Sequence, residues 1–159
     1  MRETPSQTAG PFVHIGMTPG ERGTHGVAPL AAREGAGVPV TLHGTLTDGE
    51  GAPVADALVE AWDAGGAWTR CATDDSGGWR LDIARPAVPF VGLYLVARGI
   101  NLGLHTRLYF PDADWRADPA MARVPKDRRA TLVASEEADG AYRLDIRLGG
   151  AEETVFLDV

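Results

Sequence analysis

The chain has 159 residues, of which 44% are hydrophobic and 23% charged, and its formal net charge is -7 at pH 7. This length fits one domain that buries roughly 70% of the surface of its unfolded chain. The acidic balance argues against nucleic acids and anionic membranes as partners. A single cysteine, Cys71, excludes an internal disulfide and a cysteine-rich zinc site. Neither a membrane span nor the apolar core of a signal peptide is evident, so we expect a cytoplasmic protein.

Residues 1–37 are rich in glycine and proline and show little periodicity. A compact domain rarely carries so long an irregular segment unless the segment is functional or disordered. We expect residues 4–15 to lie extended against a surface and residues 17–37 to form a flexible connector, with a frayed tail throughout as the alternative. The chain would then divide into an arm and connector, 1–37, and a domain, 38–159.

From residue 38 onward, apolar and polar residues alternate in short segments that Gly-, Pro- and Asp-rich turns separate. Such alternation is typical of half-buried strands. The expected strands lie at residues 38–47, 58–62, 69–73, 79–83, 93–97, 104–110, 142–148 and 155–159. Only residues 112–133 contain helix-like material, in short turns. The pattern predicts an all-β fold, an antiparallel β-sandwich with an extended N-terminal arm.

The most informative stretch is residues 93–110, LYLVARGINLGLHTRLYF. Its first five residues form a continuous apolar run, as in a strand buried on both faces, and residues 104–110 alternate. Arg98 stands where the first strand opens into a loop. A fixed strand end can hold a charged side chain for recognition. The alternative is an idle ion pair between Arg98 and a surface carboxylate.

The residues alone provide no catalytic motif. The histidines are scattered, without an HxH or HExxH pair: His14, His25, His43 and His105. The tyrosines fall in expected strands, where core packing is the simplest role: Tyr94, Tyr109 and Tyr142. Cys71 is expected to be a small buried hydrophobe. Taken alone, these residues predict a β-sandwich without an evident active site.

Three segments carry a resemblance to a known family: TPSQTAGPFVHIG at 4–16, LYLVARGINLGLHTRLYF at 93–110, and YRLDIRLGGAEETVFLDV at 142–159. Together they resemble the alpha chains of protocatechuate 3,4-dioxygenases, within the intradiol ring-cleavage dioxygenase family. The likeness extends from end to end. It implies a hetero-oligomer of alpha and beta chains that contains non-haem iron(III).

The resemblance also implies that the beta chain holds the iron, through two tyrosinates and two histidines. The two histidine positions are occupied here by Phe90 and Gly92. The loops that would carry the tyrosines, after Trp62 and after residues 85–86, are cut short. Iron(III) needs anionic oxygen donors and imidazoles that converge on one point. We therefore expect this chain to bind no metal and to contribute no catalytic residue.

In this family the alpha chain completes the substrate pocket of its partner. The resemblance assigns substrate binding to Thr8, Gly10, Pro11 and Arg98. Gly10 would permit close backbone approach, Pro11 would stiffen the arm, and Arg98 would present a planar fork to a carboxylate.

The implied activity is intradiol cleavage of protocatechuate to 3-carboxy-cis,cis-muconate, in the catabolism of aromatic compounds. Substrate and O2 would meet at the interface with the beta subunit, and the isolated chain would be inactive. The alternative is a free-standing transthyretin-like β-sandwich that serves as a binding or structural module without catalysis.

Overall fold

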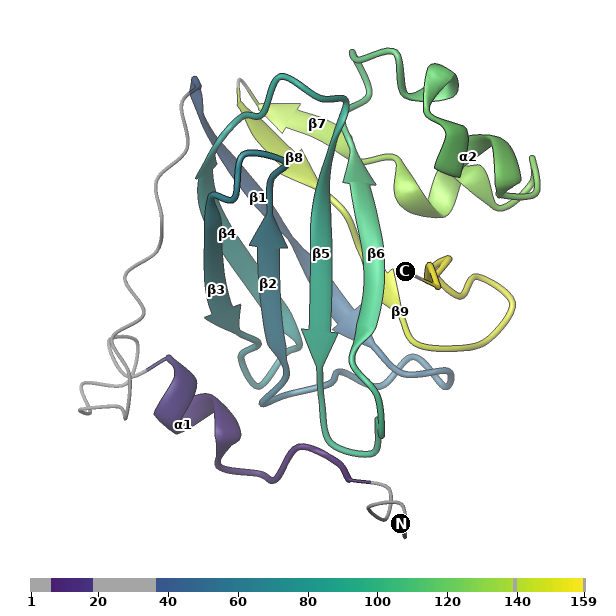
Figure 1. The fold of residues 1–159 in the computed structure, drawn as a ribbon. Helices are drawn as coiled ribbons and strands as arrows, with labels where there is room; N and C mark the ends of the chain where they lie inside the picture. The colour runs from purple at the N-terminus through teal and green to yellow at the C-terminus, as the bar shows by residue number, and fades with distance from the viewer. Residues whose placement is uncertain (1–6, 19–36, 139, 159) are drawn as a thin grey trace, which may run out of the picture.

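The computed structural model describes residues 7–18, 37–138 and 140–158. The described residues form two packed sheets, with a short helix near the N-terminus and further short helices after the sixth strand (Figure 1). The strands are β1 (Pro39–Thr47), β2 (Leu58–Trp62), β3 (Trp68–Ala72), β4 (Gly78–Ala84), β5 (Phe90–Val96), β6 (Leu104–Tyr109), β7 (Ser135–Ala138), β8 (Ala141–Arg143) and β9 (Ile146–Arg147). The helical segments are α1 (Val13–Met17), η2 (Trp115–Ala117), α2 (Pro119–Arg123) and η3 (Arg129–Leu132). Within these ranges, the helices are too short and too polar to cross a membrane.

The first sheet has the order β4-β1-β8-β7, with β9 also paired to β1, and the second has the order β3-β2-β5-β6. The two sheets lie face to face, which confirms the predicted all-β sandwich (Figure 1). The second sheet is antiparallel throughout. The first is mixed rather than purely antiparallel, because β1 runs parallel to β8 and β9. A short hairpin forces the two strands that it joins to pair antiparallel. The connection from β1 to β8 is long, so β8 can run parallel to β1.

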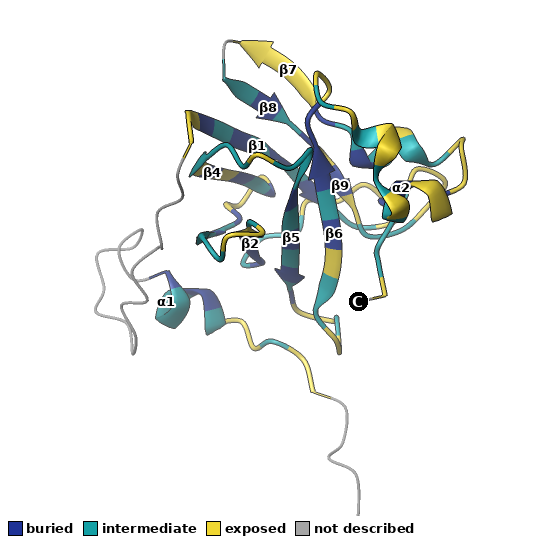
Figure 2. Cartoon of the chain, turned by 45° about the horizontal axis from the view of Figure 1, so that its top comes forward, coloured by how far each residue is buried: buried dark blue, intermediate teal, exposed yellow. Residues whose placement is uncertain are grey.

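Apolar side chains from both sheets form one core. Buried residues alternate with more exposed ones along the strands (Figure 2). In β1, Leu42 and Leu46 are fully buried, as the alternating pattern predicts. Gly44 holds the inward position between them, because a Cβ there would lie 1.9 Å from the carbonyl oxygen of Leu144. Cys71 is buried in the same core, in agreement with the sequence analysis.

Strand β5 differs from the sequence prediction, because only one of its faces belongs to the core. Leu93 and Leu95 point into the sandwich and are at most 1% exposed. Phe90, Gly92 and Tyr94 lie on the opposite face and are half-buried. The prediction of a strand buried on both faces is therefore wrong, since the continuous apolar run includes residues that line a surface pocket.

The C-terminal strands are shorter than predicted. The expected strand at 142–148 is interrupted between β8 and β9, where the carboxylate of Asp145 accepts hydrogen bonds of 2.9 Å from the backbone and the hydroxyl of Thr45. The expected strand at 155–159 is absent from the described residues 155–158. There Leu157 donates one backbone hydrogen bond, of 2.7 Å, to His105 of β6.

The arm contains helix α1, whereas the sequence predicted an extended chain as far as residue 15. The amide of Val13 donates to the carbonyl oxygen of Gly10, and Thr18 closes the other end of the helix through two 2.8 Å bonds to the His14 carbonyl oxygen. Residues 1–6 and 19–36 lie outside the described ranges. The division of the chain at residue 37 therefore stays a prediction.

One end of the core is closed by Arg85, which follows β4. Its guanidinium donates to Tyr142 Oη at 2.7 Å and to Asp112 Oδ1 at 2.6 Å, and it lies 4.3 Å above the ring of Phe110. The hydrogen bond from Arg85 holds the pKa of Asp112 below its ordinary value. A carboxyl with a lowered pKa in the folded state stabilises the fold only while it is ionised.

We expect the contribution of Asp112 to the free energy of unfolding to disappear as the pH falls through its lowered pKa. The Asp112 side chain is 53% exposed, so the contribution should be only about 0.5 kcal/mol at neutral pH. An Asp112→Asn variant should be less stable than the wild type by this amount at neutral pH, and the two should converge at an acidic pH below the lowered pKa of Asp112. Urea unfolding at both pH values measures the difference. A gap that persists at low pH would contradict the ionic origin.

Candidate functional site

Thr8 of the arm lies against the loop that follows β5. Its hydroxyl donates to the carbonyl oxygen of Ala97 at 3.4 Å and accepts a hydrogen bond from the amide of Gly99 at 2.9 Å. Gly99 has a φ of +82°, in the left-handed region that favours glycine. Ala97 and Gly99 flank Arg98, so the arm holds the backbone on both sides of that residue. The structure thus brings together two residues that the sequence predicted for one site.

Asp56, in the turn before β2, links Arg98 to helix α1. One carboxylate oxygen of Asp56 lies 3.7 Å from Arg98 Nη2, and the other lies 3.3 Å from Nε2 of His14. His14 is only 3% exposed. Asp56 has a φ of +64°, which is uncommon for a residue other than glycine. Sequence analysis missed Asp56 and His14, because no local pattern separates Asp56 from the other acidic turn residues.

The Arg98 side chain lies near a carboxylate, that of Asp56, which is the contact expected if Arg98 were an idle surface ion pair. The side chain is nevertheless 56% exposed. The 3.7 Å separation from Asp56 is longer than a charge-assisted hydrogen bond. A guanidinium has five N–H donors in a planar fork. The contact with Asp56 therefore leaves donors of Arg98 facing solvent, where a second anion can be bound.

Gly10 and Pro11, also predicted for the site, lie on the exposed part of the arm (Figure 2). Apart from its chain neighbours, no described residue has an atom within 4 Å of the position that a Cβ would take at Gly10. Phe12 beside them is 74% exposed. Of the predicted site residues, the structure brings Thr8 and Arg98 together and leaves Gly10 and Pro11 exposed.

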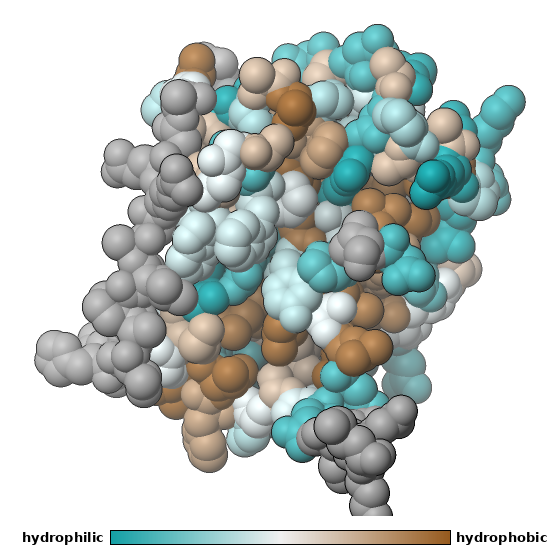
Figure 3. Space-filling model, viewed as in Figure 1, coloured by the Kyte–Doolittle hydropathy of each residue, from teal (hydrophilic) through white to brown (hydrophobic). Residues whose placement is uncertain are grey.

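A separate pocket, of about 640 Å³, opens on the outer face of the second sheet. This face carries neutral and apolar side chains between hydrophilic patches (Figure 3). The residues that line the pocket come mainly from β2, β5 and β6: Glu60, Trp62, Asp63, Ala64, Phe90, Gly92, Leu93, Tyr94, His105, Thr106, Arg107 and Leu157. The two positions predicted to replace histidine ligands, Phe90 and Gly92, both lie in it.

The residues of this pocket do not fit an iron(III) centre. Among the described residues, no three His, Cys, Asp or Glu side chains converge on one point. Tyr94 is the one tyrosine that lines the pocket. The hydroxyl of nearby Tyr109 is engaged by Arg107 and Asp118, each at 3.2 Å. Burial raises the pKa of the Tyr109 phenol.

Comparison with solved structures defines the fold class. The chain matches an intradiol ring-cleavage dioxygenase from Tetranychus urticae with a TM-score of 0.54 at 11% identity, over 78% of this chain and 86% of that one. At this identity the likeness concerns the fold alone. No protein-family model matches the chain. The sandwich is that of the intradiol ring-cleavage dioxygenases.

Comparison with curated proteins defines the family. The protocatechuate 3,4-dioxygenase alpha chain of Pseudomonas putida is 39% identical, with 98% of this chain and 96% of the relative covered. The protein of the same name from Burkholderia cepacia is 33% identical, with 100% and 98% covered. The chain belongs to the family of protocatechuate 3,4-dioxygenase alpha chains.

The family membership confirms the resemblance seen in the sequence, and it does not support a free-standing module. The alignments extend over 193 and 194 positions, against the 159 residues of this chain. The relatives therefore carry segments that this chain lacks.

Proposed function

We propose that this chain is the non-iron-binding alpha subunit of a protocatechuate 3,4-dioxygenase, which completes the substrate pocket of an iron(III)-bearing beta subunit. The complex would cleave protocatechuate to 3-carboxy-cis,cis-muconate, with substrate and O2 at the interface. The observation that carries the proposal is the contact of Thr8 with the backbone around Arg98 at an exposed site. This contact supports a single site built by the arm, which carries Thr8, and by the loop that carries Arg98. The family resemblance assigned both residues to the same substrate pocket.

The surface around Arg98 has the character of an interface. Phe12 on the arm is 74% exposed and Leu102 in the β5–β6 loop is 80% exposed. Phe12 belongs to the same arm as Thr8, and Leu102 to the same loop as Arg98, so both segments of the proposed site carry an exposed apolar side chain. Interfaces combine such apolar anchors with arginine. The beta subunit is the partner that the family name implies.

Arg98 is suited to the carboxylate of a dihydroxybenzoate. Its guanidinium can donate two parallel hydrogen bonds to a carboxylate, and its exposed donors are not consumed by Asp56. Gly10 and Pro11 would close over the ring from the arm, where Gly10 has the space to let another backbone approach. In this arrangement the alpha chain supplies binding and orientation, and the iron of the beta subunit supplies the oxygenation chemistry.

Co-expression with a beta chain of the same family, followed by a catechol ring-cleavage assay, tests the proposal. We expect a stable hetero-oligomer that cleaves protocatechuate, and no activity from this chain alone. A chain that never associates with a beta subunit, and whose addition leaves the activity of that subunit unchanged, would overturn the proposal.

The chain purified alone should be colourless and free of iron. Phe90 and Gly92 supply no ligand. Glu60 of the pocket is bonded to Arg70, and Arg107 is bonded to Asp118. Tyrosinate-to-iron charge transfer therefore has no source in this chain. Elemental analysis and a visible absorption spectrum provide the measurement. Iron bound near one equivalent per chain, with a visible band, would show that the ligand set is located elsewhere in the chain.

A further inference from the structure

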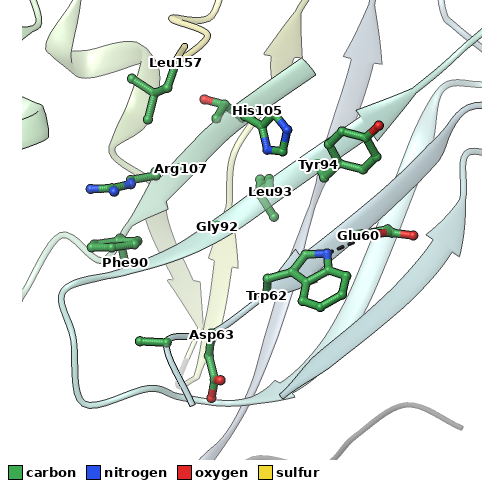
Figure 4. A pocket seen from close by; sticks show the side chains of 12 residues that line it. Glu60, Trp62, Asp63, Phe90, Gly92, Leu93, Tyr94, His105, Arg107 and Leu157 are labelled. Carbon is green, nitrogen blue, oxygen red and sulfur yellow. Dashed lines mark hydrogen bonds between the residues drawn. The ribbon is translucent and has the colours of Figure 1, made fainter. Parts of the chain in front are cut away.

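Aromatic side chains form the walls of the pocket on the outer face of the second sheet (Figure 4). Trp62 at the end of β2 is 43% exposed, which is unusual for so large an apolar side chain. Tyr94 on β5 packs against His105 of β6, with ring centroids 4.7 Å apart. Phe90 lies 3.8 Å beneath the guanidinium of Arg107. These rings are held in place by neighbours and leave the space between them open.

Gly92 lies between the two aromatic residues of β5 and keeps that space open. A Cβ at this position would meet only the carbonyl oxygen of Trp62 at 3.5 Å and the Cβ of Trp62 at 4.0 Å. Both distances are ordinary van der Waals contacts, so the strand could carry a larger side chain here. The pocket volume of about 640 Å³ falls within the range of small-molecule sites.

Two charged side chains of the pocket are already neutralised by partners. Glu60 pairs with Arg70, whose Nε donates to it at 2.8 Å, and it accepts a 2.9 Å hydrogen bond from the indole of Trp62. Nη1 of Arg107 donates to Asp118 at 2.7 Å. No cation of the pocket therefore has its charge uncompensated, and an anionic ligand would gain little.

His105 and Asp63 are among the polar groups that remain for a ligand. His105 is exposed, and within the described ranges its imidazole makes a ring contact but no hydrogen bond or ion pair. Asp63 at the rim accepts one backbone hydrogen bond, of 2.8 Å, from Ala67. An imidazole can donate to or accept from a hydroxyl, whereas a carboxylate repels another carboxylate.

We propose that this pocket is a second, non-catalytic binding site for a small uncharged phenol or catechol. The ring packs among Trp62, Phe90 and Tyr94, and a hydroxyl bonds to His105. Aromatic pairing and burial stabilise the ring, and the absence of an uncompensated cation makes carboxylated rings weaker ligands. The inference rests on the pocket of this chain and is independent of the function proposed for Arg98, whose expected preference is for the carboxylated ring.

Isothermal titration calorimetry on the full chain, purified alone, tests the site with catechol and protocatechuate as probes. We expect saturable binding of about one catechol per chain, and weaker binding of protocatechuate. Gly92→Leu places a side chain in the pocket and should abolish binding. Gly16→Leu is the matched control, because Gly16 lies in α1 and, outside that helix, no described residue has an atom within 4 Å of a Cβ there. It should leave catechol binding unchanged.

Trp62→Ala provides a second variant, because this partly exposed side chain can be removed without opening the core. It should weaken catechol binding by about tenfold. Arg98→Ala should have no effect on this binding, which separates the pocket from the site of the arm. Absence of saturable catechol binding to the wild type, unchanged binding by Gly92→Leu, or tighter binding of protocatechuate would each overturn the inference.

Discussion

Arg98→Ala is expected to lower kcat/KM for protocatechuate by 10- to 100-fold in the complex reconstituted with a beta subunit. Losing a charge-assisted hydrogen bond to a carboxylate costs about 1.5–3 kcal/mol, which corresponds to that range. Catechol has no carboxylate and should lose much less. Arg98→Lys should recover only part of the loss, because an ammonium cannot form two parallel hydrogen bonds. Steady-state kinetics with both substrates provide the measurement, and the iron content of the complex should not change.

Arg80→Ala is the matched control for Arg98→Ala. Arg80 lies on β4, its side chain is 66% exposed, and it pairs with Asp82 at 3.0 Å, so its removal also breaks one exposed ion pair. It should leave both substrates unaffected. Equal losses for protocatechuate and catechol in Arg98→Ala would show that Arg98 supports the interface or its contact with Asp56. No loss for either would leave Arg98 as an idle surface ion pair.

The strands of the sandwich could be predicted because their pattern is local. The alternation of β1 and the bounds of β2, Leu58–Trp62, follow from neighbouring residues alone. The apolar run at 93–97, most of which lies in β5, was misinterpreted, because Tyr94 is apolar enough for a core and yet lines a pocket. Hydrophobicity alone does not separate a buried face from the wall of a pocket.

The site could be predicted only in part. The resemblance to alpha chains named Thr8 and Arg98, but periodicity gave no reason to place them together. Asp56 and His14 were missed because their contacts join segments far apart in the sequence, and tertiary packing alone brings them to 3.3 Å. The interruption between β8 and β9 was missed for the same reason, since the bonds of Asp145 to Thr45 depend on parallel pairing with β1.

Removal of residues 1–12 is expected to leave the sandwich folded and to impair the complex severely. The first described secondary-structure element, α1, begins at Val13, and His14 keeps its contact with Asp56 after the truncation. Within residues 7–12, the side-chain hydrogen bonds to the body are those of Thr8. Circular dichroism and the midpoint of thermal unfolding of the isolated chain should therefore change little.

Assembly should respond differently, because Phe12 is exposed in the chain alone and would be buried against the beta subunit. Burying a phenylalanine contributes about 1.5–3 kcal/mol, so losing it should weaken association by about 10- to 100-fold. Turnover should fall further, because Thr8, Gly10 and Pro11 are also removed. Phe12→Ala isolates the apolar part, and Val38→Ala, at an apolar position 72% exposed, is its control. Analytical ultracentrifugation and the ring-cleavage assay compare the forms. Full assembly and undiminished turnover after truncation would mean that the arm takes no part in the partner's pocket.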